Sequence, residues 1–271
     1  ISLFIFVDNS SLNIISEIIF IIFSFFTVVL IIKRKKIYFE FELILLIFFV
    51  LTCVSSILWA VNQVVSLSMA ITMLQLFILV FLVYNLFLDE TRFEILPFAI
   101  IVAGFVMFIY SIYIYGISNI YMSIVEEKRL GGEINQENTF GMFSAITFIT
   151  CIYYALIKNK KTFYFLSVIS FPFIISSGSR KALLMIPIGF MVLLFFRYGF
   201  KKIYKYLFYT LIFLFIFYLL LQTNFLSFMN RRLISMMNSI VGEKTDPSTF
   251  IRQSMIKYGI ELIKERPILG Y

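Results

Sequence analysis

Residues 163–196 read FYFLSVISFPFIISSGSRKALLMIPIGFMVLLFF, which is two apolar runs joined by a short polar turn. The turn lies within Ser176–Leu184, and the runs cover residues 163–175 and 182–196. Neither run is longer than a single crossing of a bilayer requires. We therefore expect two apolar helices that meet at this turn, with Arg180 at the rim of the membrane.

The composition of the whole chain extends this interpretation. Of its 271 residues, 61% are hydrophobic and only 14% are charged, with a mean hydropathy of +0.99. A soluble domain of this size does not have such a composition. Long apolar runs, rather than ten-residue alternating strands, predict an all-α polytopic helical membrane bundle. The net charge of +8 is attributed to loop lysines on the cytoplasmic side and not to nucleic-acid binding.

The two cysteines do not indicate a chemical site. Cys53 and Cys151 both fall inside apolar runs, and the chain contains no histidine. This pattern favours buried packing residues over a disulfide or a metal centre. We expect neither a metal nor another cofactor.

The hydropathy pattern predicts about eight transmembrane spans. They are expected at residues 14–32, 43–61, 68–88, 95–115, 139–157, 163–177, 182–196 and 206–222. The expected inner loops then carry twelve Lys and Arg residues, against four in the short outer segments. Because positive residues gather on the cytoplasmic side, this asymmetry predicts the orientation. Residues 1–222 are expected to form the bundle, with an outer polar segment at residues 116–137.

Residues 223–271 are expected to form an external segment with a helix at about 249–265. Apolar residues recur there at helical spacing, and the helix should begin near Pro247 and end before Pro267. One apolar face would rest on the membrane surface or on the bundle. The chain begins at Ile1 rather than Met and ends at Tyr271 inside a polar stretch, so we expect a fragment of a longer protein.

Three arginines lie on the expected outer side, namely Arg129, Arg180 and Arg252. A guanidinium presents a planar fork of donors that fits phosphate oxygens in pairs, so these residues are candidates to bind a lipid pyrophosphate. The possible supporting residues are Gly131, Gly132, Asn138, Gly178 and Ser179. The alternative for each arginine is a side chain that reaches the lipid headgroups. Asn138 is either a helix N-cap or a substrate contact, and Glu133 and Glu137 are either solvated acids or bases.

At these residues the sequence resembles the O-antigen ligase and O-antigen polymerase family of bacterial envelope proteins. The resemblance rests on three short motifs in order. They are Arg-Leu-Gly-Gly followed by a helix-starting Asn (Arg129–Gly132, Asn138), Gly-Ser-Arg with apolar residues after it (Gly178–Leu184), and an arginine about fifteen residues before Pro-Ile-Leu-Gly (Arg252; 267–270). Lys181 departs from the pattern, because the family more often has glycine there.

The resemblance implies ten to twelve helices, a large external loop, and transfer of a glycan from an undecaprenyl-pyrophosphate carrier to a hydroxyl acceptor. It assigns Arg129, Arg180 and Arg252 to the pyrophosphate. In such proteins a histidine activates the acceptor, but this chain has none, so the catalytic base is unknown and is expected beyond residue 271 or among other residues. We expect an inverting, metal-independent glycosyltransferase of the bacterial cytoplasmic membrane, with its site facing outside.

Several functions stay open from the sequence. Polymerisation of repeat units for a capsule or for the O-antigen of lipopolysaccharide is favoured over transfer to a lipid or protein acceptor. A polysaccharide or lipid-carrier transporter would place ionisable residues and broken helices near mid-membrane, and the expected spans contain almost no charges. A non-catalytic scaffold would tolerate lysine in place of the outer arginines. Flippase and chain-length regulator proteins are the expected partners, and nucleic acid is not.

Overall fold

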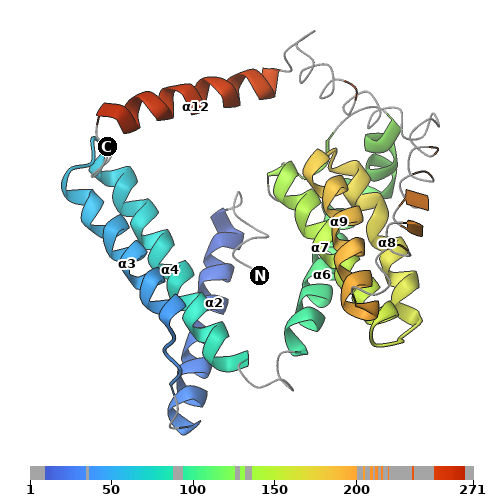
Figure 1. Ribbon diagram of the computed structural model, residues 1–271, viewed down its shortest axis with the longest axis horizontal. Coiled ribbons are helices and arrows are strands. Elements are labelled where there is room, and N and C mark those ends of the chain that lie inside the picture. Colours follow the sequence, from blue (N-terminus) through green and yellow to red (C-terminus); the bar gives the residue numbers. More distant parts are fainter. Residues whose placement is uncertain are drawn as a thin grey trace. The chain divides into compact units, whose positions relative to one another are not determined.

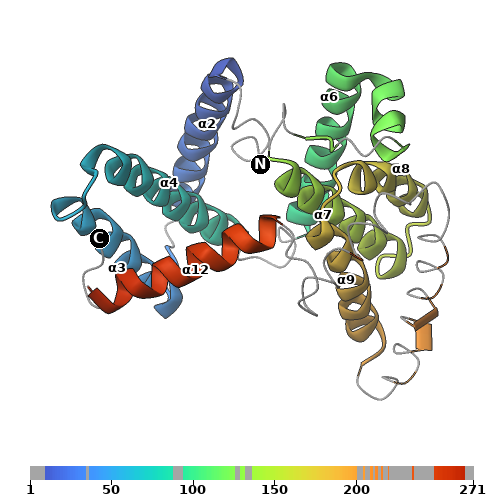
Figure 2. The ribbon, with the colours of Figure 1, turned by 90° about the horizontal axis from the view of Figure 1, so that it is seen from above.

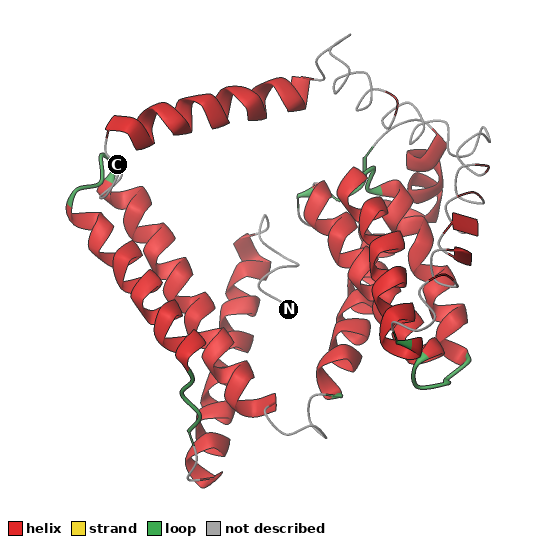
Figure 3. Ribbon diagram, in the orientation of Figure 1, coloured by secondary structure: helices red, strands yellow, loops and turns green. Residues whose placement is uncertain are grey.

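The computed structural model describes residues 10–34, 37–87, 94–125, 129–131, 136–199 and 247–265, and single positions between 204 and 234. Every regular element in these ranges is a helix (Figure 3). The predicted span at 206–222, where only single positions are described, lies outside them, and so does Gly132.

Among the residues that the structure describes, five helices are long and apolar enough to cross a membrane. They are Phe41–Leu58, Gln63–Phe87, Ile95–Ile124, Glu137–Leu156 and Arg180–Tyr198, and the shorter apolar helices are Ile18–Lys33 and Thr162–Ser176. The predicted all-α polytopic membrane bundle is confirmed, and the chain is a multi-pass membrane protein.

The chain divides into two compact units, which are described separately. One unit contains residues 1–20 and 94–237, and the other contains residues 21–93 and 238–271. This division differs from the expected one into a bundle (1–222) and an external segment (223–271). It groups residues by contact and does not decide which of them lie in the membrane, so the expected division stays a prediction.

The unit that contains residues 21–93 is built on two antiparallel spans. Helix α3 (Phe41–Ser55) continues into a short 3₁₀ turn, η1 (Ser56–Leu58), and packs against α4 (Gln63–Phe87). Helix α4 begins earlier than the expected position 68. The Asn62 side chain accepts a hydrogen bond from the Val65 N–H at 3.2 Å and so caps the first turn. Helix α12 (Pro247–Glu265) also belongs to this unit, whereas α2 (Ser10–Arg34) is divided between the two units after Phe20 (Figure 1).

A buried amide on α4 holds the segment that precedes α3. Asn85 is 3% exposed; its side-chain oxygen accepts a hydrogen bond from Tyr38 N at 2.8 Å, and its Nδ2 donates to Tyr38 O at 3.3 Å. Its Nδ2 also donates to the Phe81 carbonyl at 3.0 Å, one turn earlier in α4. The buried polar side chain thus bonds to the backbone of both Tyr38 and Phe81, which gives Asn85 a structural role.

The other unit carries the remaining four helices, α6 (Ile95–Val125), α7 (Glu137–Leu156), α8 (Thr162–Ser176) and α9 (Arg180–Tyr198). Helix α7 packs against α6, α8 and α9 and is therefore central (Figures 1 and 2). Two close approaches depend on glycine. A Cβ on Gly104 would lie 2.2 Å from Thr147 Oγ1, and one on Gly189 would lie 2.5 Å from Ile149 Cδ1. Small residues allow helices to approach closely in a membrane bundle.

Helix α6 does not end where the expected span ended. Gly116 breaks the helix with φ 73° and ψ 155°, and helical structure then resumes up to Val125. Ile120 and Ile124 lie on one side of this second segment and are buried in the apolar clusters of the unit. The expectation of a polar segment from residue 116 onward is therefore wrong for residues 117–125, where an apolar face at helical spacing packs on the bundle.

A polar contact joins the residue before the start of α6 to residues at the end of α7 and just after it. Lys158 pairs with Glu94, and the Tyr154 hydroxyl donates to the Glu94 carbonyl at 2.8 Å. The hydrogen bond from Lys158 to Glu94 raises the pKa of the lysine. The contact joins the segment before α6 to the connection between α7 and α8.

Candidate functional site

The turn between α8 and α9 is the centre of the candidate site. Helix α8 ends at Ser176 and α9 begins at Arg180, so only three residues connect them. Gly178 has φ +60°, in the left-handed region that favours glycine, and its N–H donates to the Ile175 carbonyl at 2.9 Å. Ser177 and Ser179 are both 0% exposed. The turn is therefore a packed element of the protein interior and not a solvated loop.

The serine hydroxyls hold the turn together. Ser177 Oγ donates to the Ile174 carbonyl at 2.7 Å and accepts from Ser179 N at 3.1 Å. Ser179 is the N-cap of α9, where its hydroxyl oxygen accepts from Ala182 N at 3.4 Å. An N-cap of this kind fixes the direction in which the helix leaves the turn. The backbone at Arg180 lies between these contacts and is positioned by them.

Helix α7 begins directly against the turn. A Cβ on Gly141 would lie 2.3 Å from Ser177 Oγ and 2.7 Å from Ser179 Cβ, so the two backbones approach more closely than any other residue would allow. Sequence analysis missed Gly141 and Ser177. The contact joins residues 36 positions apart, and no local pattern signals it.

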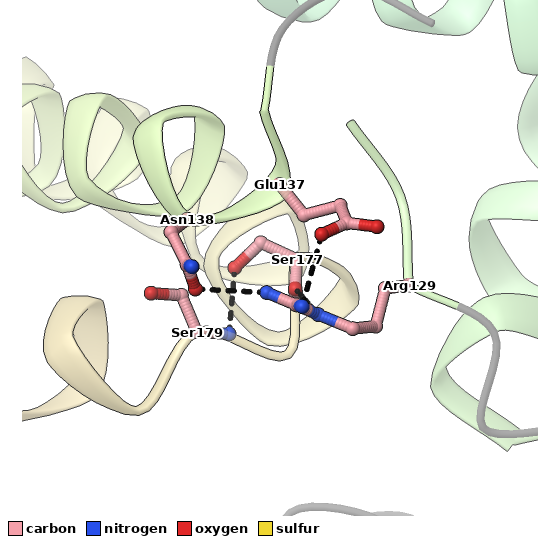
Figure 4. Close-up of polar contacts among 5 residues, drawn as sticks. All are labelled: Arg129, Glu137, Asn138, Ser177 and Ser179. Atoms are coloured by element: carbon pink, nitrogen blue, oxygen red, sulfur yellow. Dashed lines mark hydrogen bonds and ion pairs between the residues drawn. The ribbon is translucent and has the colours of Figure 1, made fainter. Parts of the chain in front are cut away.

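Arg129 connects three parts of this site (Figure 4). Its Nε donates to the Ser177 carbonyl at 3.0 Å, and its Nη2 donates to Asn138 Oδ1 at 2.9 Å. Its Nη1 lies 2.9 Å from Glu137 Oε2 in an ion pair. The guanidinium thus joins the segment before α7, the first turn of α7, and the α8–α9 turn.

Leu130, which follows Arg129, contacts the C-terminal end of α8. Leu130 N donates to the Ser176 carbonyl at 2.9 Å, and Gly131 has φ +124°. A Cβ on Gly131 would lie 3.0 Å from both Glu137 Cα and Phe140 Cβ. The last carbonyls of a helix lack partners within it and favour a nearby cation. Arg129 and Leu130 together satisfy two such carbonyls, which explains why a cation is stable at this position.

Of the two alternatives for Asn138, an N-cap or a substrate contact, the structure does not show the N-cap. Helix α7 begins one residue earlier, at Glu137, and Gln136 holds the N-cap position. Asn138 instead uses its side-chain oxygen to accept from Arg129. Glu137, considered as a solvated acid or a base, is paired with the same arginine and is 35% exposed at its side chain.

Arg180 and Lys181 are the first two residues of α9. Arg180 is half-buried and Lys181 is exposed. The N-terminus of a helix carries positive potential, so a cation there is destabilising by about 0.3–1 kcal/mol and an anion is favoured. An anion, whether a lipid headgroup or a phosphate, is therefore favoured next to this pair.

Arg252 lies on α12, in the other unit, and is exposed. Its helical neighbours at three, four and eleven positions further on are Met255, Ile256 and Ile263, so it shares a face with apolar residues. The other charged residues of the described helix, from Lys257 to Glu265, follow a different face. Arg129 thus contacts the turn that precedes Arg180. Arg252 belongs to the other unit.

No group of three or more His, Cys, Asp or Glu side chains that could hold a metal is found among the residues that the structure describes. The basic and serine side chains of the site are groups that bind oxyanions.

Comparison with known proteins bears on the same region. Residues 165–271, or 107 of the 271 residues, match the family model described as O-antigen ligase. The matched range begins inside α8 and includes the α8–α9 turn and α12. No curated protein and no solved structure matches the chain. The match covers less than half of the chain, and over this region the chain is similar to the O-antigen ligase family.

Proposed function

We propose that this protein is an envelope glycan polymerase that transfers oligosaccharide repeat units from an undecaprenyl-pyrophosphate carrier, on the outer face of the cytoplasmic membrane. The observation that carries the proposal is the position of Arg180 and Lys181 at the start of α9, on a turn fixed by buried serines. This arrangement holds positive charge and helix N–H groups in one place, which suits a pyrophosphate. The family match over the same turn supports it.

The chemistry requires two tasks. The acceptor hydroxyl oxygen attacks the anomeric carbon, the bond from that carbon to the pyrophosphate oxygen breaks, and the hydroxyl proton passes to a base. Arg180 would stabilise the charge that develops on the leaving pyrophosphate, a task for which one preorganised donor contributes about 3 kcal/mol. We propose the same role for Arg252, as the family resemblance implies. We note no pair of carboxylates suited to a covalent intermediate among the described residues of the site, so the proposed transfer inverts the anomeric carbon. Arginine can bind the pyrophosphate oxygens directly, so the proposal uses no metal.

The base that accepts the hydroxyl proton is not assigned. Glu137 is a carboxylate of the described site, and it is engaged in an ion pair with Arg129 at 2.9 Å. We therefore do not assign it the role of base.

Three other functions are weighed against the polymerase. An O-antigen ligase would use the same donor site and differ in the acceptor, a lipid or a protein. A transporter would use polar residues and helix breaks within the spans. In the described spans, Gly104 and Asn85 have the packing and hydrogen-bonding roles given above. A scaffold would not need the charge arrangement at α9. As a polymerase, the protein would work with a flippase and a chain-length regulator.

A cell-based experiment tests the proposal. The gene would be deleted in its own host and restored as wild type, Arg180→Lys or Lys161→Gln, with equal membrane abundance verified by immunoblot. Lysine keeps the charge of Arg180 but loses the paired donors, whereas Lys161 is an exposed cation between α7 and α8 and serves as the control. The proposal expects a ladder of surface glycan for wild type and control, and a single repeat unit for Arg180→Lys. Full-length glycan that is no longer attached to its acceptor would favour the ligase, and an unchanged ladder would contradict both.

A further inference from the structure

The donors of Arg129 are largely engaged by the protein itself. Nε, Nη1 and Nη2 each contact a partner within 3.0 Å, namely the Ser177 carbonyl, the Glu137 carboxylate and the Asn138 amide oxygen. A guanidinium has five N–H groups, so at least three are already in use. The carboxylate also offsets the positive charge. An oxyanion that bound Arg129 in the paired geometry would have to displace Glu137.

The contacts continue from Arg129 to the start of α9. The Ser177 carbonyl accepts from Arg129, the Ser177 hydroxyl accepts from Ser179 N, and the Ser179 hydroxyl caps the helix at Ala182. Every serine in this series is fully buried, so the series has no solvent to replace a lost partner. The backbone of Arg180 lies inside it.

We infer that Arg129 is a positioning residue, which holds the α8–α9 turn so that Arg180 can bind the pyrophosphate, and is not itself a ligand of that group. The inference rests on the proposed function, because it concerns how the pyrophosphate site is built. It revises the expectation that Arg129, Arg180 and Arg252 all contact the substrate.

Substitutions of Asn138 distinguish the two possible roles of Arg129, because the two roles predict opposite changes in pyrophosphate affinity. If Arg129 positions the turn, Asn138→Ala removes an acceptor and loosens the turn, so pyrophosphate binding weakens. Asn138→Asp keeps an oxygen at the same place and restores the contact. If Arg129 binds the pyrophosphate directly, Asn138→Ala frees a donor and preserves or tightens binding. Asn138→Asp then adds a second carboxylate that competes with the ligand and weakens binding.

The test uses the full chain in nanodiscs and measures the dissociation constant of farnesyl pyrophosphate by isothermal titration calorimetry. Wild type, Asn138→Ala, Asn138→Asp, Arg180→Lys and the control Lys161→Gln are compared well below their unfolding temperatures. We expect Asn138→Ala to weaken binding about threefold to tenfold, less than the full loss of a charged hydrogen bond because the effect is indirect. We expect Asn138→Asp to restore binding to within about twofold of wild type.

The outcomes are distinguishable. Binding by Asn138→Ala equal to or tighter than wild type overturns the positioning role, and so does a loss in Asn138→Asp that matches or exceeds the loss in Asn138→Ala. Those results leave the proposed function intact as long as Arg180→Lys weakens binding. If wild type does not bind the probe, or if Arg180→Lys binds as wild type does, the proposed function fails and the inference fails with it.

Discussion

The guanidinium of Arg129 bonds to the backbone carbonyl of Ser177, 48 positions later in the chain, with Nε and the oxygen 3.0 Å apart (Figure 4). This contact joins the polar stretch before α7 to the polar turn between α8 and α9. It explains how Arg129, which precedes α7, and the Ser-Gly-Ser-Arg turn, which precedes α9, contribute to one site. The candidate site is therefore one connected structure, with α7 as its support.

Gly178 should be the least replaceable residue of the turn for conformational reasons. Its φ of +60° is unfavourable for a residue with a Cβ, so Gly178→Ala should lower the free energy of unfolding by about 1–2 kcal/mol. Gly178→Asn should cost less, because asparagine tolerates the left-handed region. Unfolding in detergent micelles titrated with SDS measures both values. Equal losses for Ala and Asn would show that backbone conformation is not the limiting factor.

Gly141 should be irreplaceable for steric reasons. Its Cβ position lies 2.3 Å from Ser177 Oγ, so Gly141→Ala forces α7 and the turn apart and should cost about 1–3 kcal/mol. Gly259→Ala is a matched control, since nothing lies within 4 Å of its Cβ position on helix α12.

The control should be neutral or stabilising by up to about 1 kcal/mol, because alanine is the better helix former. The same SDS titration reads both variants. A Gly141→Ala protein as stable as wild type would show that the turn can move away from α7 without loss.

Arg252 and Lys257 provide a charge-matched comparison on α12. Arg252 shares a face with apolar residues, whereas Lys257 lies on the face that carries the other charges. If the arginine contacts the pyrophosphate, Arg252→Gln should reduce glycan transfer about tenfold or more. Lys257→Gln should leave transfer unchanged within about twofold, since an exposed cation of this kind contributes little. Incorporation of labelled repeat units by membrane vesicles measures the rates, and equal rates for the two variants would remove Arg252 from the site.

The helices of this protein could be predicted because membrane spans depend on local hydropathy. The helix that contains Arg180 was expected at 182–196 and lies at 180–198, and the predicted apolar stretch near 249–265 is helical as α12. A run of apolar residues long enough to cross a bilayer has few alternatives to a helix. The local hydropathy of the sequence therefore predicts most of these helices.

The contacts of the site could not be predicted in the same way. Asn138 appeared as an N-cap because it precedes an apolar run, yet it accepts from Arg129, a residue placed there by tertiary packing. Likewise the buried face of residues 117–125 became visible only once Ile120 and Ile124 had a bundle to pack on. Polar residues and glycines near helix ends suit several roles, and the choice among them depends on neighbours distant in the sequence.

The affinity of Arg180→Lys for farnesyl pyrophosphate, measured against wild type and Lys161→Gln in nanodiscs, tests the central claim most directly. Lysine preserves the charge at the start of α9 and removes the paired donors of the guanidinium. We expect binding that is about tenfold weaker or more for Arg180→Lys, at an unchanged unfolding temperature, and wild-type affinity for the control. Wild-type affinity in Arg180→Lys would show that Arg180 does not bind the pyrophosphate and would leave it as a residue that reaches the lipid headgroups.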